Sequence, residues 1–202
     1  MAKPPYWRDY PRREDLESSV RAIVNPQPFN RPFQSPVLSD LIAERHYFCR
    51  LRGLRPSAFK KTYDDYPDRF YGLFESPGWH PVSWKKCLKP PPSGEEIITA
   101  ALRNRIEVEK IAFRRAHPIC GRCKQAPSEE THHAEPTFKA IVGRVFAAVA
   151  PSDIDSALAD WNWFEKEEFT LPDGHSILRH FDEIHANARL EALCKPCHDA
   201  TK

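Results

Sequence analysis

The sequence contains no run of about 18 apolar residues, the length that a membrane-spanning helix requires. Its first residues, MAKPPYWRDYPRREDLE, also lack the apolar core of a secretory signal, and the acidic residues among them argue against an Arg-rich transit peptide. We therefore expect no membrane partner and an intracellular, reducing location, either cytoplasmic or in the nucleoid. An organelle matrix stays open as an alternative.

Glycine is scarce, with 7 residues against 20 prolines in a chain of 202. The prolines cluster in residues 4–36 and 90–92, where they disfavour both helix and central strand. They predict an extended proline-rich arm over residues 1–37 and a linker at residues 90–92. We expect the arm to contact a protein partner or a second copy of the chain; the alternative is a poorly ordered tail.

The region between arm and linker, residues 38–92, is expected to hold a small helix and a hairpin. Leu38, Leu41, Ile42 and Phe48 recur at helical spacing, and Gly53 supplies a stop. Bulky residues then alternate around a Ser-Pro-Gly turn, which predicts an aromatic hairpin formed by residues 70–74 and 82–88.

The last domain, residues 93–202, is predicted to begin with a helix. Ser93 and Glu96 have the spacing of a capping box, and apolar residues follow along one face as far as Phe113. The segments PTFKAIVGRVFAAV and PSDIDSALADW predict two further helices, the second capped by Ser152. The expected fold class is α+β, mostly helical, with small strands.

The formal net charge of +2 conceals an uneven distribution. Residues 82–124 hold ten Lys and Arg against four Glu, about +6, whereas residues 125–188 hold four basic and twelve acidic residues, about −8. If nucleic acid is the partner, the first stretch faces its phosphates; a solvated charged face is the alternative. The candidate contacts are Arg103, Arg114, Arg115, Arg122 and Lys124.

Four of the six cysteines form two C-x-x-C pairs about 70 residues apart, Cys120 with Cys123 and Cys194 with Cys197. Such pairs converge readily on one tetrahedral Zn(II), because thiolates suit that ion and the two-residue spacer aims both sulfurs inward. We therefore predict a structural zinc site. The other cysteines, Cys49 and Cys87, are expected to be buried small hydrophobes.

Three histidines accompany the cysteine pairs. His132 and His133 follow the first pair within about ten residues, and His198 follows Cys197 directly, so closing the zinc site brings all three together. Adjacent residues on a strand point to opposite faces unless a bulge or strand end re-aims one of them, and Pro136 marks such an end. A zinc ribbon without catalysis is the alternative that the cysteines alone allow.

The pattern C-x-x-C … HH-x-x-P … L-C-x-x-C-H resembles the HNH endonucleases of the ββα-metal group, over residues 120–202. The segment HHAEP is also similar to the tandem histidine and proline of the colicin DNases. The resemblance implies a C-terminal ββα-metal motif stapled by the four-cysteine zinc site. It also implies that a helical segment, at about residues 137–180, is inserted between the two halves of the motif.

By this resemblance, the chain hydrolyses phosphodiester bonds of DNA, with RNA as the alternative substrate. His132 and His198 would ligate a catalytic divalent ion, Mg(II), Mn(II), Ni(II) or Zn(II), separate from the structural zinc, and His133 would be the general base. The family usually has Asn about five residues before the final cysteine pair, where this chain has Arg189. Asn187 or His185 could take its place, so Asn187 and Arg189 are candidate site residues.

An alternative hypothesis uses the same residues but makes the chain a binding module and not an enzyme. The chain would then be a catalytically silent zinc module that binds nucleic acid or a protein assembly. The missing Asn, the proline-rich arm and the modest net charge favour that reading.

Overall fold

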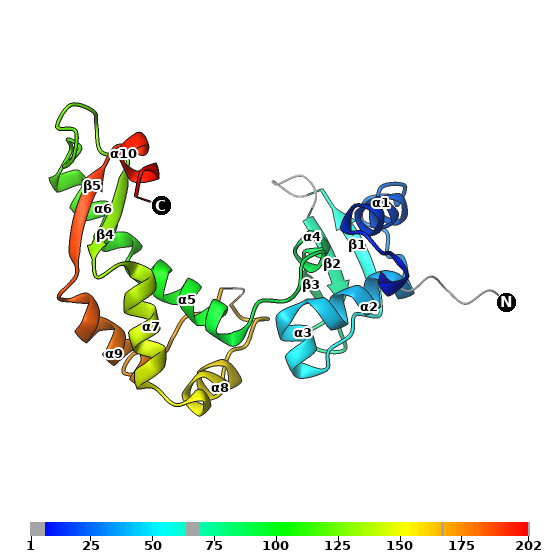
Figure 1. Cartoon of the computed structure of the whole chain (residues 1–202). Coiled ribbons are helices and arrows are strands. Elements are labelled where there is room, and N and C mark those ends of the chain that lie inside the picture. Colours follow the sequence, from blue (N-terminus) through cyan, green and yellow to red (C-terminus); the bar gives the residue numbers. More distant parts are fainter. Residues whose placement is uncertain (1–6, 64–68, 167, 202) are drawn as a thin grey trace. The chain divides into compact units, whose positions relative to one another are not determined.

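The chain divides into two compact units, Met1–Pro92 and Ser93–Lys202, which appear in the ribbon of Figure 1. The computed structural model describes residues 7–63, 69–166 and 168–201. The boundary between the units follows the run of prolines at residues 90–92, as expected of a linker. None of the helices in the described ranges is long and apolar enough to cross a membrane.

The first unit combines helices with a three-stranded antiparallel sheet. After a short 3-10 turn at Trp7–Asp9 come helices α1 (Arg13–Val24), α2 (Pro36–Arg45) and α3 (Tyr47–Arg52). Strands β1 (Ala58–Thr62), β2 (Arg69–Leu73) and β3 (Trp79–Pro81) pair in that order, and helix α4 (Trp84–Cys87) follows.

The core of this unit draws side chains from both the helices and the strands. Phe59 of β1 stacks on Phe70 of β2 with ring centroids 5.4 Å apart, and Leu38, Leu41 and Ile42 of α2 are fully buried. Burial of a side chain of this size stabilises a fold by roughly 1.5 to 3 kcal/mol. The helix predicted from these apolar positions is confirmed, but it breaks at His46 into α2 and α3 before ending at Gly53.

Two expectations for this unit need correction. Residues 1–37 are not an extended arm over their described part, because residues 13–24 form α1, whose Leu16, Val20 and Val24 are buried. The hairpin exists, but its second strand is Trp79–Pro81, and the segment predicted as that strand begins helix α4 instead. Strand β1, which extends the hairpin to three strands, was not predicted.

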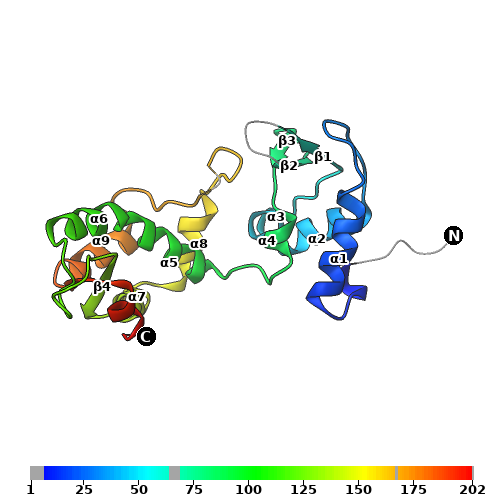
Figure 2. The ribbon, with the colours of Figure 1, turned by 90° about the horizontal axis from the view of Figure 1, so that it is seen from above.

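The second unit places a two-stranded antiparallel sheet among helices. The chain runs through α5 (Gly94–Arg105), α6 (Glu107–Ala116), β4 (Glu130–Glu135), α7 (Phe138–Ala148) and α8 (Pro151–Ala159). It then forms α9 (Ser176–His185), β5 (Arg189–Leu193) and α10 (Lys195–Asp199). Helix α7 packs against α9, while α8 packs against α5 away from the sheet, as Figures 1 and 2 both show.

The helix predicted from residue 93 onward is present, with its capping box, but it breaks at Ile106 into α5 and α6. The two helices predicted after the histidine pair are confirmed as α7 and α8. Ser152 does not cap α8, because the N-cap position is Ala150 and Pro151 takes the first turn. The helical segment between β4 and β5 extends beyond residue 180, because α9 ends at His185, so it holds more helix than predicted. The α+β class is confirmed.

Candidate functional site

The four cysteines lie in two segments, the turn that begins at Cys120 and the first turn of α10, which meet at the end of the β4–β5 sheet. Cys120 opens a tight turn in which its carbonyl oxygen accepts from the Lys124 N–H at 3.0 Å, with Lys124 in the left-handed region at φ 57°. Cys194 directly follows β5 and is the N-cap of α10, and its carbonyl oxygen accepts from the His198 N–H at 2.9 Å. The N–H of Gly121 donates to the Ala192 oxygen at 2.7 Å and so ties the two halves together.

This arrangement brings all four sulfur atoms within 4.8 Å of one another. The Sγ atoms of Cys123 and Cys194 are 3.9 Å apart. A tetrahedral zinc ion with Zn–S bonds of about 2.3 Å requires sulfur atoms about 3.8 Å apart, so the spacing fits that ion. The four cysteines, Cys120, Cys123, Cys194 and Cys197, can therefore hold a metal ion such as zinc.

The thiols in this cluster do not ionise independently. Hydrogen bonds from the backbone, that of Cys194 first, lower the pKa of Cys120 to about 6, whereas the contact with Cys194 raises the pKa of Cys197 to about 12. Close sulfur atoms oppose one another's ionisation, and a bound divalent cation is the group that relieves that opposition. Cys49 and Cys87 are buried in the other unit, as predicted, and burial raises the pKa of each thiol to about 12.

The tandem histidines lie on β4, at the point where the strand becomes irregular. His132 pairs with Glu191 and His133 with Leu190, and the register then shifts between His133 and Glu135. Such a shift is the bulge expected before Pro136, and it changes the direction in which neighbouring side chains point. The hydroxyl of Thr131 donates to the Lys110 oxygen at 2.9 Å and fixes this strand to α6.

The three predicted histidines line one pocket of about 220 Å³. The rings of His132 and His198 lie with their centroids 5.8 Å apart, and Nδ1 of His132 is 3.4 Å from the Thr201 hydroxyl. The Nδ1 atom of His198 is buried without a hydrogen-bond partner among the described residues, although Asp199 Oδ1 lies 4.0 Å away. Arg103, Lys110, Thr131, Thr137 and Phe138 are among the other residues that line the pocket.

His133 also meets a fourth histidine. Its Nε2 atom lies 3.0 Å from Nε2 of His185, the last residue of α9, and both side chains are buried. The His185 ring stacks on Phe181 with centroids 5.2 Å apart and an interplanar angle of 15°, so packing sets its orientation. His185 Nδ1 faces Glu109 Oε2 of α6 at 3.8 Å.

Burial keeps His132 and His133 neutral at pH 7. It lowers the pKa of His133 to about 4, with the electrostatic effect of the neighbouring His185 as the next cause, and it also lowers the pKa of His132. Neutral imidazoles have the lone pairs that metal binding and proton acceptance both require. The pocket is therefore chemically suited to either task at neutral pH.

The other two candidates lie elsewhere. The Asn187 amide donates to the Glu183 oxygen at 3.1 Å, and the Arg189 guanidinium lies 3.5 Å from the Glu191 carboxylate on the exposed end of β5. Neither is among the described residues that line the histidine pocket. Of Asn187 and His185, which were considered for the position of the HNH asparagine, His185 is the one in contact with His133.

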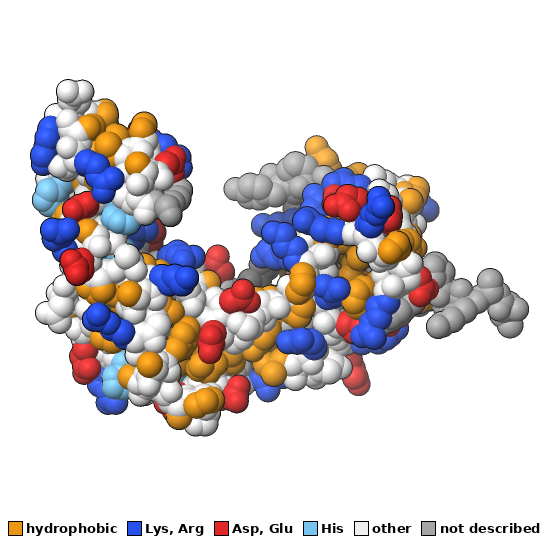
Figure 3. Space-filling view, in the orientation of Figure 1, with side chains coloured by type: hydrophobic (Ala, Val, Ile, Leu, Met, Phe, Trp, Pro, Cys, Tyr) orange, Lys and Arg blue, Asp and Glu red, His pale blue; other side chains and the backbone are white. Residues whose placement is uncertain are grey.

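The predicted phosphate contacts do not form one cluster. Arg103 lies over the Phe138 ring at 5.1 Å beside the histidine pocket, and Arg115 is exposed. Arg114 donates to the Glu129 oxygen at 3.2 Å, and Arg122 donates to the Cys197 oxygen at 3.2 Å. On the face shown in Figure 3, acidic side chains lie between the basic ones over both units.

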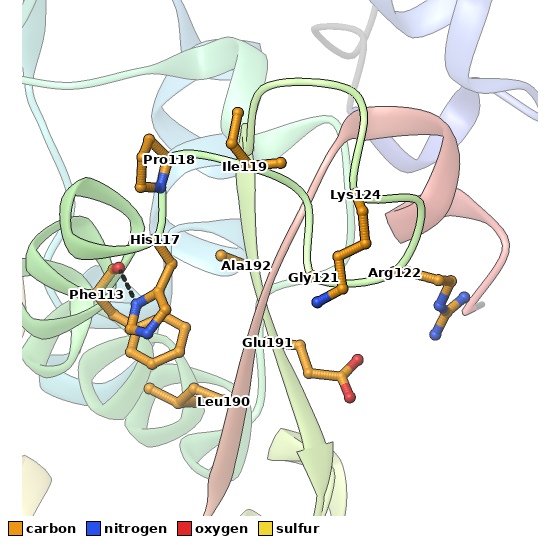
Figure 4. Close-up of a pocket in the computed structure, with 10 residues that line it drawn as sticks. All are labelled: Phe113, His117, Pro118, Ile119, Gly121, Arg122, Lys124, Leu190, Glu191 and Ala192. Atoms are coloured by element: carbon orange, nitrogen blue, oxygen red, sulfur yellow. Dashed lines mark hydrogen bonds between the residues drawn. The ribbon is translucent and has the colours of Figure 1, made fainter.

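A second, larger pocket of about 630 Å³ includes Arg122 and Lys124 in its lining. Phe113 and His117 stack within it at 4.2 Å, and the His117 Nδ1 atom lies 2.9 Å from the Phe113 oxygen. In Figure 4 these two rings lie on one side of β5, and Arg122, Lys124 and Glu191 lie on the other. Two of the predicted basic contacts thus line the same pocket as a stacked ring pair, of which His117 is exposed and Phe113 half-buried, a feature that the sequence analysis missed.

Comparison of the chain with protein-family models, with curated proteins and with solved structures finds no match.

Proposed function

We propose that the chain is a metal-dependent endonuclease of the HNH type that hydrolyses phosphodiester bonds of DNA. The observation that carries the proposal is the pocket in which His132, His133 and His198 meet beside the four-cysteine cluster. Residues of strand β4 and helix α10 line this pocket, and β4, its partner β5 and α10 follow one another in the order of a ββα-metal motif. Three further helices separate the two strands in the sequence.

Each histidine has a role that its position supports. His132 and His198 approach each other from the strand and from the helix, and together they would hold a divalent ion, Mg(II), Mn(II), Ni(II) or Zn(II). Imidazole ligands favour the last three of these ions over Mg(II), which prefers oxygen. When bound, the ion would stabilise negative charge on the scissile phosphate and on the leaving oxygen.

His133 would act as the general base. One of its ring nitrogens is occupied by His185, so the other, Nδ1, is the atom left to accept a proton from a water in the pocket. Arg103 lines the same pocket and would supply a positive charge to a bound phosphate. The proposed base, His133 of β4, and the proposed phosphate-binding cation, Arg103 of α5, therefore line the same cavity.

A catalytically silent zinc module that binds nucleic acid is the second candidate. It is favoured by the position of Asn187 and Arg189 outside the pocket and by the second surface, where Arg122 and Lys124 lie near the stacked Phe113 and His117. Stacked aromatic rings beside cations suit a nucleic-acid strand without any cleavage. An RNA substrate would use the same residues.

The deciding experiment is a plasmid-nicking assay with added Mg(II), Mn(II) or Ni(II), or with EDTA, and zinc content measured in parallel. We expect His133→Ala to lower the rate at least ~100-fold at unchanged zinc content, because it removes the proton acceptor. The matched control is His180→Ala on α9, a half-buried histidine outside the pocket, which should cleave as the wild type does.

Wild-type protein that binds zinc and is folded, but cleaves neither DNA nor RNA with any of these ions, would favour the silent module. Cleavage of RNA alone would change the substrate and leave the assigned residues in place. Equal rates for the wild type and His133→Ala would remove His133 from the mechanism.

A further inference from the structure

Two buried histidines share one hydrogen bond in this unit, and that fact restricts their protonation. His133 and His185 face each other through their Nε2 atoms at 3.0 Å, with side chains 6% and 8% exposed. A neutral imidazole carries its hydrogen on one nitrogen and a lone pair on the other. One of the two Nε2 atoms therefore donates and the other accepts, and this choice sets the tautomer of both rings.

A third group, the Glu109 carboxylate, favours one of the two tautomer arrangements over the other. His185 Nδ1 faces the Glu109 carboxylate at 3.8 Å, and an ionised carboxylate only accepts hydrogen bonds. A hydrogen on His185 Nδ1 is favoured by that charge, whereas a lone pair there would be repelled. Glu109 is exposed, with 58% of its side chain accessible, so it biases the tautomer without being part of the buried pair.

We propose that Glu109 and His185 form a positioning relay that holds His133 as its Nε2–H tautomer. With the hydrogen of His185 on Nδ1, its Nε2 accepts from Nε2–H of His133, and Nδ1 of His133 keeps its lone pair. That atom has no hydrogen-bond partner among the described residues, and the ring lines the pocket. The opposite arrangement would place a hydrogen on His133 Nδ1 and leave no base.

The catalytic consequence of the relay rests on the proposed function. When Nδ1 of His133 takes a proton from water, the ring keeps Nε2–H, and the positive charge that results is next to the lone pair of His185. The Glu109 carboxylate lies beyond it on the same side. The relay would therefore orient the base before the proton moves and stabilise the imidazolium afterwards, as a carboxylate behind a catalytic histidine does.

The tautomer can be measured without any enzymatic activity. We would record long-range 15N–1H spectra of zinc-loaded, 15N-histidine-labelled protein and assign the His133 signals from their loss in His133→Gln. In the wild type we expect His133 to be predominantly Nε2–H. His185→Phe keeps a ring next to Phe181 but removes the acceptor, so His133 should redistribute toward Nδ1–H.

Two further variants separate the relay from a packing effect. His185→Gln offers an amide oxygen as acceptor and should keep His133 in its Nε2–H form. Glu109→Ala should lower the fraction of His133 in the Nε2–H form below that of the wild type. His180→Phe is the matched control, because it makes the same substitution on the same helix at a half-buried position outside the histidine pair. It should leave the His133 signals unchanged.

Where the wild type cleaves DNA, His185→Phe should lower kcat by ~10- to 100-fold with KM and zinc content unchanged, and His185→Gln should recover most of that loss. The inference is overturned if wild-type His133 carries its hydrogen on Nδ1, or if His185→Phe leaves the tautomer as it was. A wild type without nuclease activity would contradict the proposed function alone, since the tautomer measurement stands independently.

Discussion

At the scale of single residues, His46 links the stability of the first unit to pH. It lies between α2 and α3, and burial, with Lys86 as the next cause, lowers its pKa from 6.5 to about 4. The unfolded chain therefore binds more protons than the folded unit between those two pH values. Folding stability from this residue is fully present above pH 6.5 and is lost as the pH falls toward about 4.

We expect this loss to reach roughly 3 kcal/mol at most, since each pKa unit corresponds to about 1.4 kcal/mol. Urea unfolding of the full chain between pH 7 and pH 4 would measure it, with NMR titration of the His46 ring as the direct check. In His46→Gln, which does not titrate, the dependence of the first unit on pH should become shallower over this window. An equal slope in both proteins would show that His46 ionises freely in the folded state.

The residues of the candidate site differ in how far the sequence determines them. The cysteine spacing predicts the four-sulfur cluster, because C-x-x-C pairs have few other uses in a reducing compartment, and the structure confirms it. The choice between Asn187 and His185 needed coordinates, because one turn at the end of α9 decides which side chain faces β4. Glu109 carried no sequence signal, since it meets His185 only through the packing of α6.

At the scale of elements, the capping box of α5 is the local feature that the sequence specifies best. The Ser93 hydroxyl accepts from the Glu96 N–H at 3.1 Å, and the Glu96 carboxylate accepts from the Ser93 N–H at 2.7 Å. Replacing Ser93 by Ala leaves one of these donors unpaired, which typically costs about 1 kcal/mol.

We predict this loss for Ser93→Ala in the unfolding free energy of the second unit, measured by urea denaturation. Ser152→Ala is the control, because Ser152 lies within α8 and does not cap it. That variant should change stability by less than about 0.5 kcal/mol. A comparable loss in both variants would contradict the assignment of the caps.

The elements that sequence reasoning missed have identifiable physical causes. Prolines flank residues 13–24 on both sides but none lies within them, and Leu16, Val20 and Val24 recur at helical spacing in α1. The density of neighbouring prolines hid a helix that the spacing does predict. The break at Ile106 has no proline or glycine to announce it, so α5 and α6 read as one continuous helix.

At the scale of the whole molecule, the division at residues 90–92 was predictable because three consecutive prolines exclude helix and central strand. The content of each unit was less so. Strand β1 pairs antiparallel with β2, and its own five residues do not specify that partner. Helix α9 carries Ile177, Leu178 and Phe181 at helical spacing, so the sequence does contain a signal for this helix that the sequence analysis missed.

The two units should respond differently when zinc is removed. The four cysteines all belong to Ser93–Lys202, where Cys120, Leu193 and Cys194 form a small buried cluster at the end of the sheet. Metal binding at such a site supplies folding free energy, about 10 kcal/mol or more for small zinc modules. We therefore predict that a chelator, or Cys120→Ser, unfolds β4, β5 and α10 and leaves Met1–Pro92 folded.

Hydrogen exchange followed by mass spectrometry would separate the units within one experiment. Amides of β4 and β5 should lose protection on chelation, while those of β1 and β2 should keep it. Cys87→Ala is the matched control, since Cys87 is buried in the first unit and outside the sulfur cluster, so zinc content should stay the same. Retained protection in β4 and β5 after chelation would mean that packing alone holds the second unit and that the cysteines are not its structural metal site.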